Sequence, residues 1–466
     1  MDTLPSTTLP PPPARLFLAG LGGIGMSALA QLLRWQGHEV AGSDRELAGP
    51  GRDELYARLQ AQGIRLFPQD GTGLREFQPA ALIHSTAVEE GNPDFQAAAA
   101  RAIPRRHRAA ALAAALDRQP GRQIGIAGSC GKTSVTAWLA ETIHALGHSV
   151  LMVGGGHSHA WADAHFPGNF HADSATPEFL VYEVDESDGS LAAFRPHVGV
   201  VLNIGTDHFD RDRLRDLFAA YLGRCREAAV LSPELAAELP LPAGQPLFRF
   251  GEGLADYQAG LEGISFRLPG LGAFAVPQYG RHSASNAAAV LAILQACGLR
   301  NAAGRWPAAL AAFRGVSRRF DRLGTTPAGA ALFDDYAHNV EKLCAALATA
   351  QELTPGPVLA LFQPHGFGPL KFMREPLAPA LQRQLRPGDR FAFLPVYYAG
   401  GTTDFTPSSA EVAAELRQRG LEVLSFPDRA AAASFVRTAR DFTAVLVLGA
   451  RDPGLPAWCA TLRAGR

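Results

Sequence analysis

Three features that narrow protein function are missing from this chain of 466 residues. Its five cysteines include no CxxC pair, which argues against a zinc framework or disulfides and indicates a reducing compartment. No uninterrupted apolar run reaches about 18 residues, so no segment is predicted to span a membrane. The 43 basic and 44 acidic residues nearly cancel, and a net charge of −1 offers no general attraction to nucleic acid or anionic lipid.

The N-terminal segment also lacks the basic stretch that opens a signal peptide, since Met1-Asp2 is followed by a proline cluster at 10–13. Together with the unpaired cysteines, this favours a cytoplasmic protein without nucleic-acid or membrane partners. A chain of this length is too long for one hydrophobic core, so roughly two to four domains are expected. The sequence leaves open whether the protein is a monomer or a homodimer.

Lysine is scarce, and one of only three lysines lies in the glycine-rich segment GSCGKTS (128–134). The segment joins a predicted strand to a predicted helix. Its glycines let backbone N–H groups approach phosphate, Lys132 supplies a positive charge, and the hydroxyl of Thr133 suits Mg²⁺. Ile126 stands where the strict GxxxxGK[ST] pattern needs glycine, so the loop is a variant. It still predicts ATP or GTP binding in preference to a structural turn.

Carboxylates follow two strands predicted beyond this loop. The run EVDESD (183–188) ends one of them, and NIGTDH (203–208) ends the next. Side chains at the carboxyl ends of strands in an open α/β sheet face the ligand crevice, and Mg²⁺ prefers hard oxygen ligands. Alone, such an acidic run is more often a solvated loop. Beside a phosphate loop, it predicts a magnesium site.

A second glycine-rich turn, GLGGIG (20–25), follows the first predicted strand. A lone GxGxxG is weak, because its glycines could simply permit tight helix–strand packing. It could also mark a dinucleotide-dependent oxidoreductase, since Asp44 lies close to the position where an acid binds ribose; Asp44 could instead cap the following turn. The GKTS loop argues against the oxidoreductase.

Strand and helix patterns alternate in three segments, which predict an α/β fold of three domains at 1–118, 119–316 and 317–466. The first and third are expected to be Rossmann-like and the second to resemble a P-loop ATPase. Polar stretches at 101–108, 117–122 and 315–324 are interpreted as boundaries. Expected strands are 15–20, 38–42, 80–85, 123–127, 179–184, 198–203, 330–333, 358–362, 390–394, 422–426 and 444–449. Expected helices are 26–36, 133–146, 285–298, 340–351, 377–385 and 409–419.

Taken in order, the motifs resemble those of the Mur ligase family over nearly the whole chain. They are FLAGLGGIGMSALA, STAVEEGNPD, AGSCGKTS, EVDESDGS, NIGTDHFD, GRHSASNAAA, FRGVSRRFD, FDDYAHN, LFQPH and VYYAGG. Each motif alone is weak, but the ordered set is specific. The resemblance implies an N-terminal domain for a UDP-sugar, a central domain for ATP and a C-terminal domain for an amino acid. It also implies that ATP, with Mg²⁺, phosphorylates a carboxylate to an acyl phosphate that an amine then attacks.

The resemblance further assigns roles to individual residues. Lys132, His208 and His338 are expected to be catalytic, and Thr133, Glu183 and His208 to bind metal. His282 could instead cap its helix, Arg319 could form a surface ion pair, and His338 could bond a loop. The expected ATP-binding residues are Gly128, Ser129, Gly131, Lys132, Thr133, Ser134, His282, Asn286, Arg319 and Asp334. The expected UDP-sugar-binding residues are Gly20, Gly22, Gly23, Gly25, Ser43 and Asp44.

Two departures from the family pattern leave the added group open. The alanine-adding branch typically continues after FQPH with RYTR, whereas this chain has GFGPLK (366–371), and Lys371 does not replace an arginine fork for a carboxylate. Asn339 also replaces the second histidine of DDYxHH. The expected reaction, in peptidoglycan precursor synthesis, joins L-alanine to UDP-N-acetylmuramate. The alternatives are the recycling branch, which attaches the tripeptide L-Ala-γ-D-Glu-meso-diaminopimelate, or another amino acid.

Overall fold

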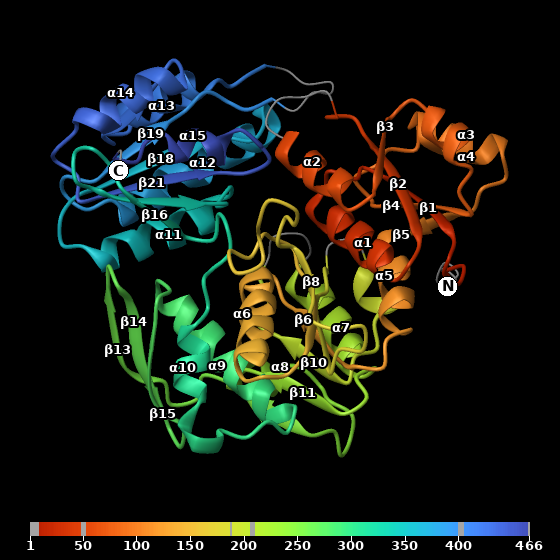
Figure 1. Cartoon of the computed structure of the whole chain (residues 1–466). Coiled ribbons are helices and arrows are strands. Elements are labelled where there is room, and N and C mark those ends of the chain that lie inside the picture. The colour runs from red at the N-terminus through yellow and green to blue at the C-terminus, as the bar shows by residue number, and fades with distance from the viewer. Residues whose placement is uncertain (1–8, 48–52, 187–188, 206–209, 399–404, 465–466) are drawn as a thin grey trace. The chain divides into compact units, whose positions relative to one another are not determined.

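The computed structural model describes residues 9–47, 53–186, 189–205, 210–398 and 405–464 (Figure 1). The chain divides into two compact units. The first comprises Met1–Tyr257, Ser265–Pro277 and His282–Val316, and the second comprises Gln258–Ile264, Gln278–Arg281 and Ser317–Arg466. Among the described residues, no helix combines the length and apolar character needed to cross a membrane.

The first unit opens with a parallel sheet of order β3-β2-β1-β4-β5. Leu16, Phe17 and Leu18 of its central strand are fully buried, because helices cover both faces of the sheet. The stretch 101–108, predicted as a boundary, instead contains β5 and the start of α5, where most of the alanines are buried. The strands are β1 Arg15–Ala19, β2 Glu39–Asp44, β3 Arg65–Pro68, β4 Ala81–His84 and β5 Arg105–His107; the helices are α1 Ile24–Trp35, α2 Asp53–Ala61, α3 Thr72–Phe77, α4 Pro93–Ala100 and α5 Arg108–Leu116.

A second sheet of the first unit has seven strands in the order β12-β11-β10-β6-β9-β7-β8. All neighbours are parallel except β8, which runs antiparallel to β7 at one edge. The strands are β6 Arg122–Ala127, β7 Val150–Val153, β8 Phe170–Ala172, β9 Phe179–Glu183, β10 Val198–Val201, β11 Ala228–Leu231 and β12 Leu247–Arg249. Its helices are α6 Lys132–Ala145, η1 Ser190–Ala193, α7 Arg211–Leu222 and α8 Pro233–Glu238.

The segment that follows contains a small sheet of order β13-β14-β15, which the sequence analysis did not predict. Its strands are short and partly exposed, so their apolar pattern is weak. They are β13 Ala255–Gly260, β14 Gly263–Leu268 and β15 Gly272–Val276, followed by α9 Arg281–Ala296, η2 Ala302–Gly304 and α10 Trp306–Ala311.

The second unit is built on a sheet of order β16-β17-β21-β18-β19-β20, parallel except for β16. Two predictions are wrong here. The stretch 315–324 is not all turn, because β16 begins at Asp321, and the helix expected at 377–385 begins at Phe367. The strands are β16 Asp321–Thr325, β17 Ala331–Asp335, β18 Val358–Gln363, β19 Arg390–Phe393, β20 Val423–Ser425 and β21 Ala444–Gly449; the helices are α11 Val340–Leu353, α12 Phe367–Gln384, α13 Ser409–Gln418, α14 Arg429–Thr438 and α15 Leu455–Ala460.

Within the first unit, α1 is tied to the residues around β8 by a buried polar network. Gln31 donates from Nε2 to Asn169 Oδ1 at 2.8 Å, and Asn169 donates from Nδ2 to Ser27 Oγ at 2.9 Å. Trp35 and Phe170 pack beside this network, with ring centroids 6.3 Å apart. Because all three polar side chains are fully buried and bonded, this contact holds α1 in a defined register.

Candidate functional site

The loop between β6 and α6 has a backbone that needs glycine at two points. Gly128 and Gly131 have φ angles of +128° and +86°, in the left-handed region that other residues rarely adopt. A Cβ on Gly131 would lie 2.9 Å from Oδ1 of Asn286, and one on Gly128 would lie 3.0 Å from the backbone nitrogen of Leu202. The loop therefore packs closely against Leu202 and Asn286 and ends at Lys132, where α6 begins.

The carboxyl end of β10 holds this loop in shape. Asn203 accepts from the Cys130 N–H through Oδ1 at 2.8 Å and donates from Nδ2 to the Cys130 carbonyl at 2.9 Å. Ser129 Oγ accepts from the Gly205 N–H at 2.8 Å. Sequence reasoning quoted Asn203 within a motif without assigning it a role, although an amide side chain at a strand end was the available signal. The loop is thus braced by side chains of the protein itself.

Lys132 lies between the loop and a carboxylate. Its Nζ donates to the Gly128 carbonyl at 2.7 Å and to Glu186 Oε2 at 2.7 Å, and both charged side chains are almost fully buried. Burial would lower the pKa of Lys132, but the carboxylates of Glu186, Glu183 and Asp185 outweigh it and raise the pKa. The ammonium is therefore kept charged beside a phosphate loop. Sequence reasoning missed Glu186, the third acid of EVDESD.

Glu183, the first acid of that run, lies against the start of α6. Its Oε2 accepts from Thr133 Oγ1 at 2.9 Å and from the Gly155 N–H at 3.1 Å. A Cβ on Gly155 would lie 2.4 Å from the same oxygen, so a side chain there would displace the Glu183 carboxylate. A carboxylate next to a hydroxyl is an oxygen donor set that suits Mg²⁺. The structure thus brings together two of the three predicted metal ligands, and the third, His208, lies outside the described residues.

The remaining predicted ATP-binding residues of the first unit are more scattered. Ser134 lies in the first turn of α6 and is partly exposed. Asn286, in α9, lies next to the phosphate loop through its approach to Gly131. His282 is exposed in the first turn of α9. Their contacts with a nucleotide stay predictions.

The N-terminal glycine turn is built around β2. The N–H groups of Gly20 and Leu21 both donate to the Ser43 carbonyl at 2.9 Å. The Gly22 N–H donates to Asp44 Oδ2 at 2.7 Å, and Asp44 Oδ1 accepts from the Glu46 N–H at 2.9 Å. Asp44 therefore joins the glycine turn to its own following turn, which agrees with the capping role considered for it.

Two side chains around that turn, Asp94 and Arg108, were not assigned a role from the sequence. The Ser43 hydroxyl is fully buried and donates to Asp94, so Ser43 supports the turn from beneath through its carbonyl. Gly23 precedes α1 as its N-cap, and a Cβ on Gly25 would lie 3.1 Å from a guanidinium nitrogen of Arg108. A cation thus lies beside the turn, in a stretch that sequence reasoning treated as a boundary.

In the second unit, the predicted nucleotide residue Asp334 is buried in an ion pair. Arg318 Nε lies 3.4 Å from Asp334 Oδ2, and burial raises the pKa of Asp334 to about 6 although Arg318 opposes the shift. Arg319 lies over the Tyr336 ring, with its guanidinium carbon 5.5 Å from the centroid. The carboxylate of Asp335 accepts from the N–H groups of Phe320 and Ala337. Asp334 and Asp335 therefore hold the 318–320 segment, the first through Arg318 and the second through the Phe320 N–H.

His338 lies beside a second histidine in the same unit. Its Nδ1 is 2.9 Å from the Tyr336 carbonyl, and its ring centroid is 5.2 Å from that of His365. Burial, together with the charges of His338 and Arg451, lowers the pKa of His365 to about 4, so His365 is neutral at pH 7. The contact with Tyr336 agrees with the loop-bonding alternative for His338, and its catalytic role stays a prediction.

A glycine loop with a buried lysine, acids at strand ends and a helix N-terminus define the first unit as a nucleotide-binding α/β unit of the P-loop type. Three family models match the chain: Mur ligase family, catalytic domain, at 18–120; Mur ligase middle domain at 126–218; and Mur ligase, glutamate ligase domain, at 318–451. The chain belongs to the Mur ligase family and is an ATP-dependent acid–amino-acid ligase.

The relatives of this chain carry related names. It is 30% identical over 426 residues to the UDP-N-acetylmuramate–L-alanine ligase of Paracoccus denitrificans, covering 85% of this chain and 84% of that one. The UDP-N-acetylmuramate-alanine ligase of Thermotoga maritima superposes with a TM-score of 0.77 at 25% identity, over 96% and 97% of the two chains. A murein peptide ligase of Psychrobacter arcticus shares the fold, with a TM-score of 0.63 at 18% identity over 96% and 98%.

These findings confirm the predicted family, the three-domain α/β fold and the enzyme class. They also confirm a ligase of peptidoglycan synthesis with a nucleotide-binding middle domain, which replaces the oxidoreductase alternative. The boundaries at 118 and 316, the oligomeric state and the individual site residues stay predictions.

Proposed function

We propose that this chain is a UDP-N-acetylmuramate–L-alanine ligase, with domains at 1–118 for the UDP-sugar, 119–316 for ATP and 317–466 for the amino acid. The observation that carries the proposal is the pairing at the phosphate loop of Lys132 with Glu186 and of Thr133 with Glu183. It puts a fixed cation and a hard-oxygen site beside one triphosphate cradle, as phosphoryl transfer requires. The similarity to alanine-adding ligases supports the choice of substrates.

The reaction follows from the chemistry of a carboxylate, which is a poor acyl donor because oxide would have to leave. The carboxylate of the muramate takes the terminal phosphoryl group of ATP, and ADP leaves. Lys132 and the N–H groups at the start of α6 balance the charge of the phosphoryl group as it moves. Thr133 and Glu183 are the residues proposed to hold Mg²⁺, which screens the phosphate charges when bound.

In the second step the amino group attacks the acyl phosphate. The C–N bond forms, the C–O bond to phosphate breaks, inorganic phosphate leaves and the amine loses a proton. We assign His338 to this step as the catalytic residue of the C-terminal domain. Arg319 and Asp334 are assigned to the nucleotide, with Asp334 acting through the neighbouring Arg318.

For the UDP-sugar, the supporting observation is the N-terminal turn. Gly23 is exposed and precedes α1 as its N-cap, at the helix end where the dipole favours a pyrophosphate. The guanidinium of Arg108 beside Gly25 adds positive charge. The N-terminus of α1 and the Arg108 guanidinium are therefore the positive groups proposed to bind the diphosphate, in a domain whose sequence contains no lysine.

A recycling ligase that attaches a tripeptide is the second candidate, because the segment after FQPH differs from the alanine-adding pattern. Phe367 starts α12 there, and its ring centroid lies 6.2 Å from that of Tyr398 and 5.3 Å from that of Phe405. An aromatic cluster replaces the arginines that would bind a carboxylate. The shared fold with a murein peptide ligase is compatible with this candidate but does not favour it.

The deciding experiment measures ADP release by the purified chain with Mg²⁺ and UDP-N-acetylmuramate against a panel of L-amino acids and the tripeptide. We expect L-alanine to give the highest kcat/KM. A higher kcat/KM with the tripeptide would establish the second candidate. The absence of ADP release with every acceptor would reject both.

A further inference from the structure

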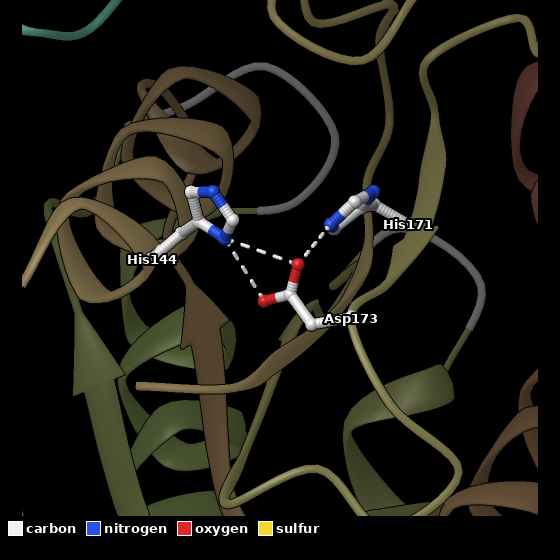
Figure 2. Close-up of side chains that lie close together, drawn as sticks. All are labelled: His144, His171 and Asp173. Atoms are coloured by element: carbon white, nitrogen blue, oxygen red, sulfur yellow. Dashed lines mark hydrogen bonds and ion pairs between the residues drawn. The ribbon is translucent and has the colours of Figure 1, made fainter. Parts of the chain in front are cut away.

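Two histidines and an aspartate come together at the β8 edge of the central sheet (Figure 2). His144 lies in the last turn of α6, His171 lies in β8, and Asp173 follows that strand. Because α6 begins at Lys132 and rises about 1.5 Å per residue, His144 is about 18 Å along the helix from the phosphate loop. The cluster is therefore separate from the ligase site.

The three side chains point their ligand atoms at one another. His171 Nε2 lies 2.7 Å from Asp173 Oδ1, and His144 Nδ1 lies 3.0 Å from the same oxygen. All three ligand atoms fall within 4.8 Å of one another. Among the residues that the structure describes, no other group of three His, Cys, Asp or Glu side chains meets this criterion. In tetrahedral coordination with bonds of about 2.1 Å, ligand atoms are about 3.4 Å apart. Shifts of about 1 Å would thus give metal geometry.

Neighbouring groups hold two of these side chains in place. Asp173 accepts from the Val150 N–H through Oδ2 at 2.9 Å, which fixes the carboxylate. The Trp161 indole stacks flat on the His171 ring, with centroids 4.3 Å apart and planes 5° apart. Such supporting contacts orient ligands before an ion arrives and raise the affinity of a site.

Two imidazoles and one carboxylate form a donor set that suits Zn²⁺, Ni²⁺ or Cu²⁺ and disfavours Mg²⁺, which prefers oxygen and water. We propose that His144, His171 and Asp173 form a binding site for a divalent transition-metal ion such as Zn²⁺, with one coordination position open to water. The bound ion fastens the edge strand β8 to the end of α6. Nothing in the ligase reaction requires this site.

The location gives the ion a structural consequence. The segment between β7 and β8 contains Gly155, which bonds Glu183, and leads to Asn169, which bonds α1. Trp161 belongs to the same segment and rests on a metal ligand. Ion binding therefore restrains a segment that reaches from the proposed magnesium site to the N-terminal sheet.

The first test is a calorimetric titration of the full-length, chelator-treated protein with Zn²⁺ in excess Mg²⁺, which occupies the hard-oxygen site. We expect one equivalent to bind, and His171→Ala and His144→Ala each to weaken binding by about tenfold or more. The matched control is His148→Ala, because His148 lies near the same corner but pairs with Glu178. Equal affinity in the wild type and His171→Ala, or no saturable binding, overturns the proposal.

Trp161 supplies a second readout that locates the ion. Paramagnetic Ni²⁺ should quench the Trp161 part of the protein fluorescence in the wild type, because the indole stacks on His171. Trp161→Phe should remove this quenching and keep Zn²⁺ binding within a few-fold. Quenching that persists unchanged in Trp161→Phe would place the ion elsewhere and reject the site. Thermal midpoints of the ion-free variants show whether each one folds.

Discussion

The first unit builds the same strand, glycine turn and helix twice, and the two copies differ in charge. In β1–α1, the turn meets the carboxylate of Asp44, which takes up the Gly22 N–H. In β6–α6, the turn ends at Lys132, which is paired with Glu186, and α6 opens with a hydroxyl bonded to Glu183. We therefore propose that the backbone of each turn lies at a phosphate group, and that the flanking side chains distinguish a metal-bound triphosphate from a nucleotide without a metal.

The helices that follow the turns repeat the contrast in their interiors. Gln31 of α1 is buried and neutral, and it bonds Asn169. Glu141 of α6 is buried and ionisable, accepting from Ser158 Oγ at 2.7 Å and from the Arg314 N–H at 3.0 Å. Burial raises the pKa of Glu141 to about 7. Near pH 7, a buried side chain of α6 therefore changes its protonation, whereas the buried Gln31 of α1 does not titrate.

The largest effect should come from removing the charge at the β6–α6 turn. Lys132→Ala should lower kcat for ADP release by about 10²- to 10³-fold, because the moving phosphoryl group loses a fixed cation. Steady-state kinetics measure this loss, while equilibrium binding of UDP-N-acetylmuramate should stay within a few-fold, since that ligand is proposed to bind at the β1–α1 turn.

Lys132→Ala also leaves the Glu186 carboxylate buried without its partner, which destabilises the fold. The double variant Lys132→Ala/Glu186→Gln removes this penalty and serves as the control. If the double variant regains more than about a tenth of wild-type kcat, the loss arose from misfolding and the catalytic role of Lys132 is wrong.

Replacing the buried Glu141 of α6 with a neutral amide, like that of Gln31 in α1, should change the pH dependence of stability. The folded state holds the Glu141 proton to about pH 7, whereas the unfolded chain releases it near 4.5. Below pH 4.5 both states are protonated; as pH rises to 7, the unfolded state loses its proton first, so stability falls by up to about 3 kcal/mol and then levels off.

Glu141→Gln should abolish this fall, because the amide can accept from the Arg314 N–H and donate to Ser158. Thermal midpoints between pH 5 and 8 measure it, with the exposed Glu178→Gln as the matched control. A variant that loses stability with pH as steeply as the wild type would show that Glu141 is already ionised in the folded protein.

A smaller effect is expected at the proposed magnesium site. Glu183→Gln should raise the Mg²⁺ concentration for half-maximal ADP release by about 10- to 100-fold, because a neutral amide is a weaker ligand for a hard cation. Glu178→Gln, in the turn that precedes β9, is the matched control. An unchanged Mg²⁺ titration would remove Glu183 from the metal site.

The smallest effect is expected at the β1–α1 turn. Asp44→Ala removes the acceptor for the Gly22 N–H and should weaken UDP-sugar binding about tenfold, with kcat at saturation unchanged. Glu39→Ala, at the exposed start of the same strand, should leave binding as in the wild type. Isothermal titration with UDP-N-acetylmuramate distinguishes the two. A tenfold fall in kcat instead would mean that the two turns act as one site.

Patterns close together in sequence were predictable here, and pairings between distant segments were not. The glycine loops, most central strands and the acids at strand ends follow from apolar runs and motif order. Which acid of EVDESD meets Lys132 depends on how β9 turns at its end, and sequence spacing does not fix this. The buried hydroxyl of Ser43 and the cation of Arg108 likewise follow from strand register and helix placement. The sequence predicted only the C-terminal part of helix α12. Pro376 and Pro379 lie inside this helix, and proline usually ends or kinks one.

The two hydrogen bonds between the Asn203 side chain and the Cys130 backbone have a kinetic consequence. Because β10 sets the shape of the phosphate loop, the conformational entropy of ordering the loop is lost during folding and not during nucleotide capture. The same ready cradle receives substrate and product nucleotide alike. We therefore expect ADP to leave when its other contacts around the loop are lost, without a change in the shape of the loop.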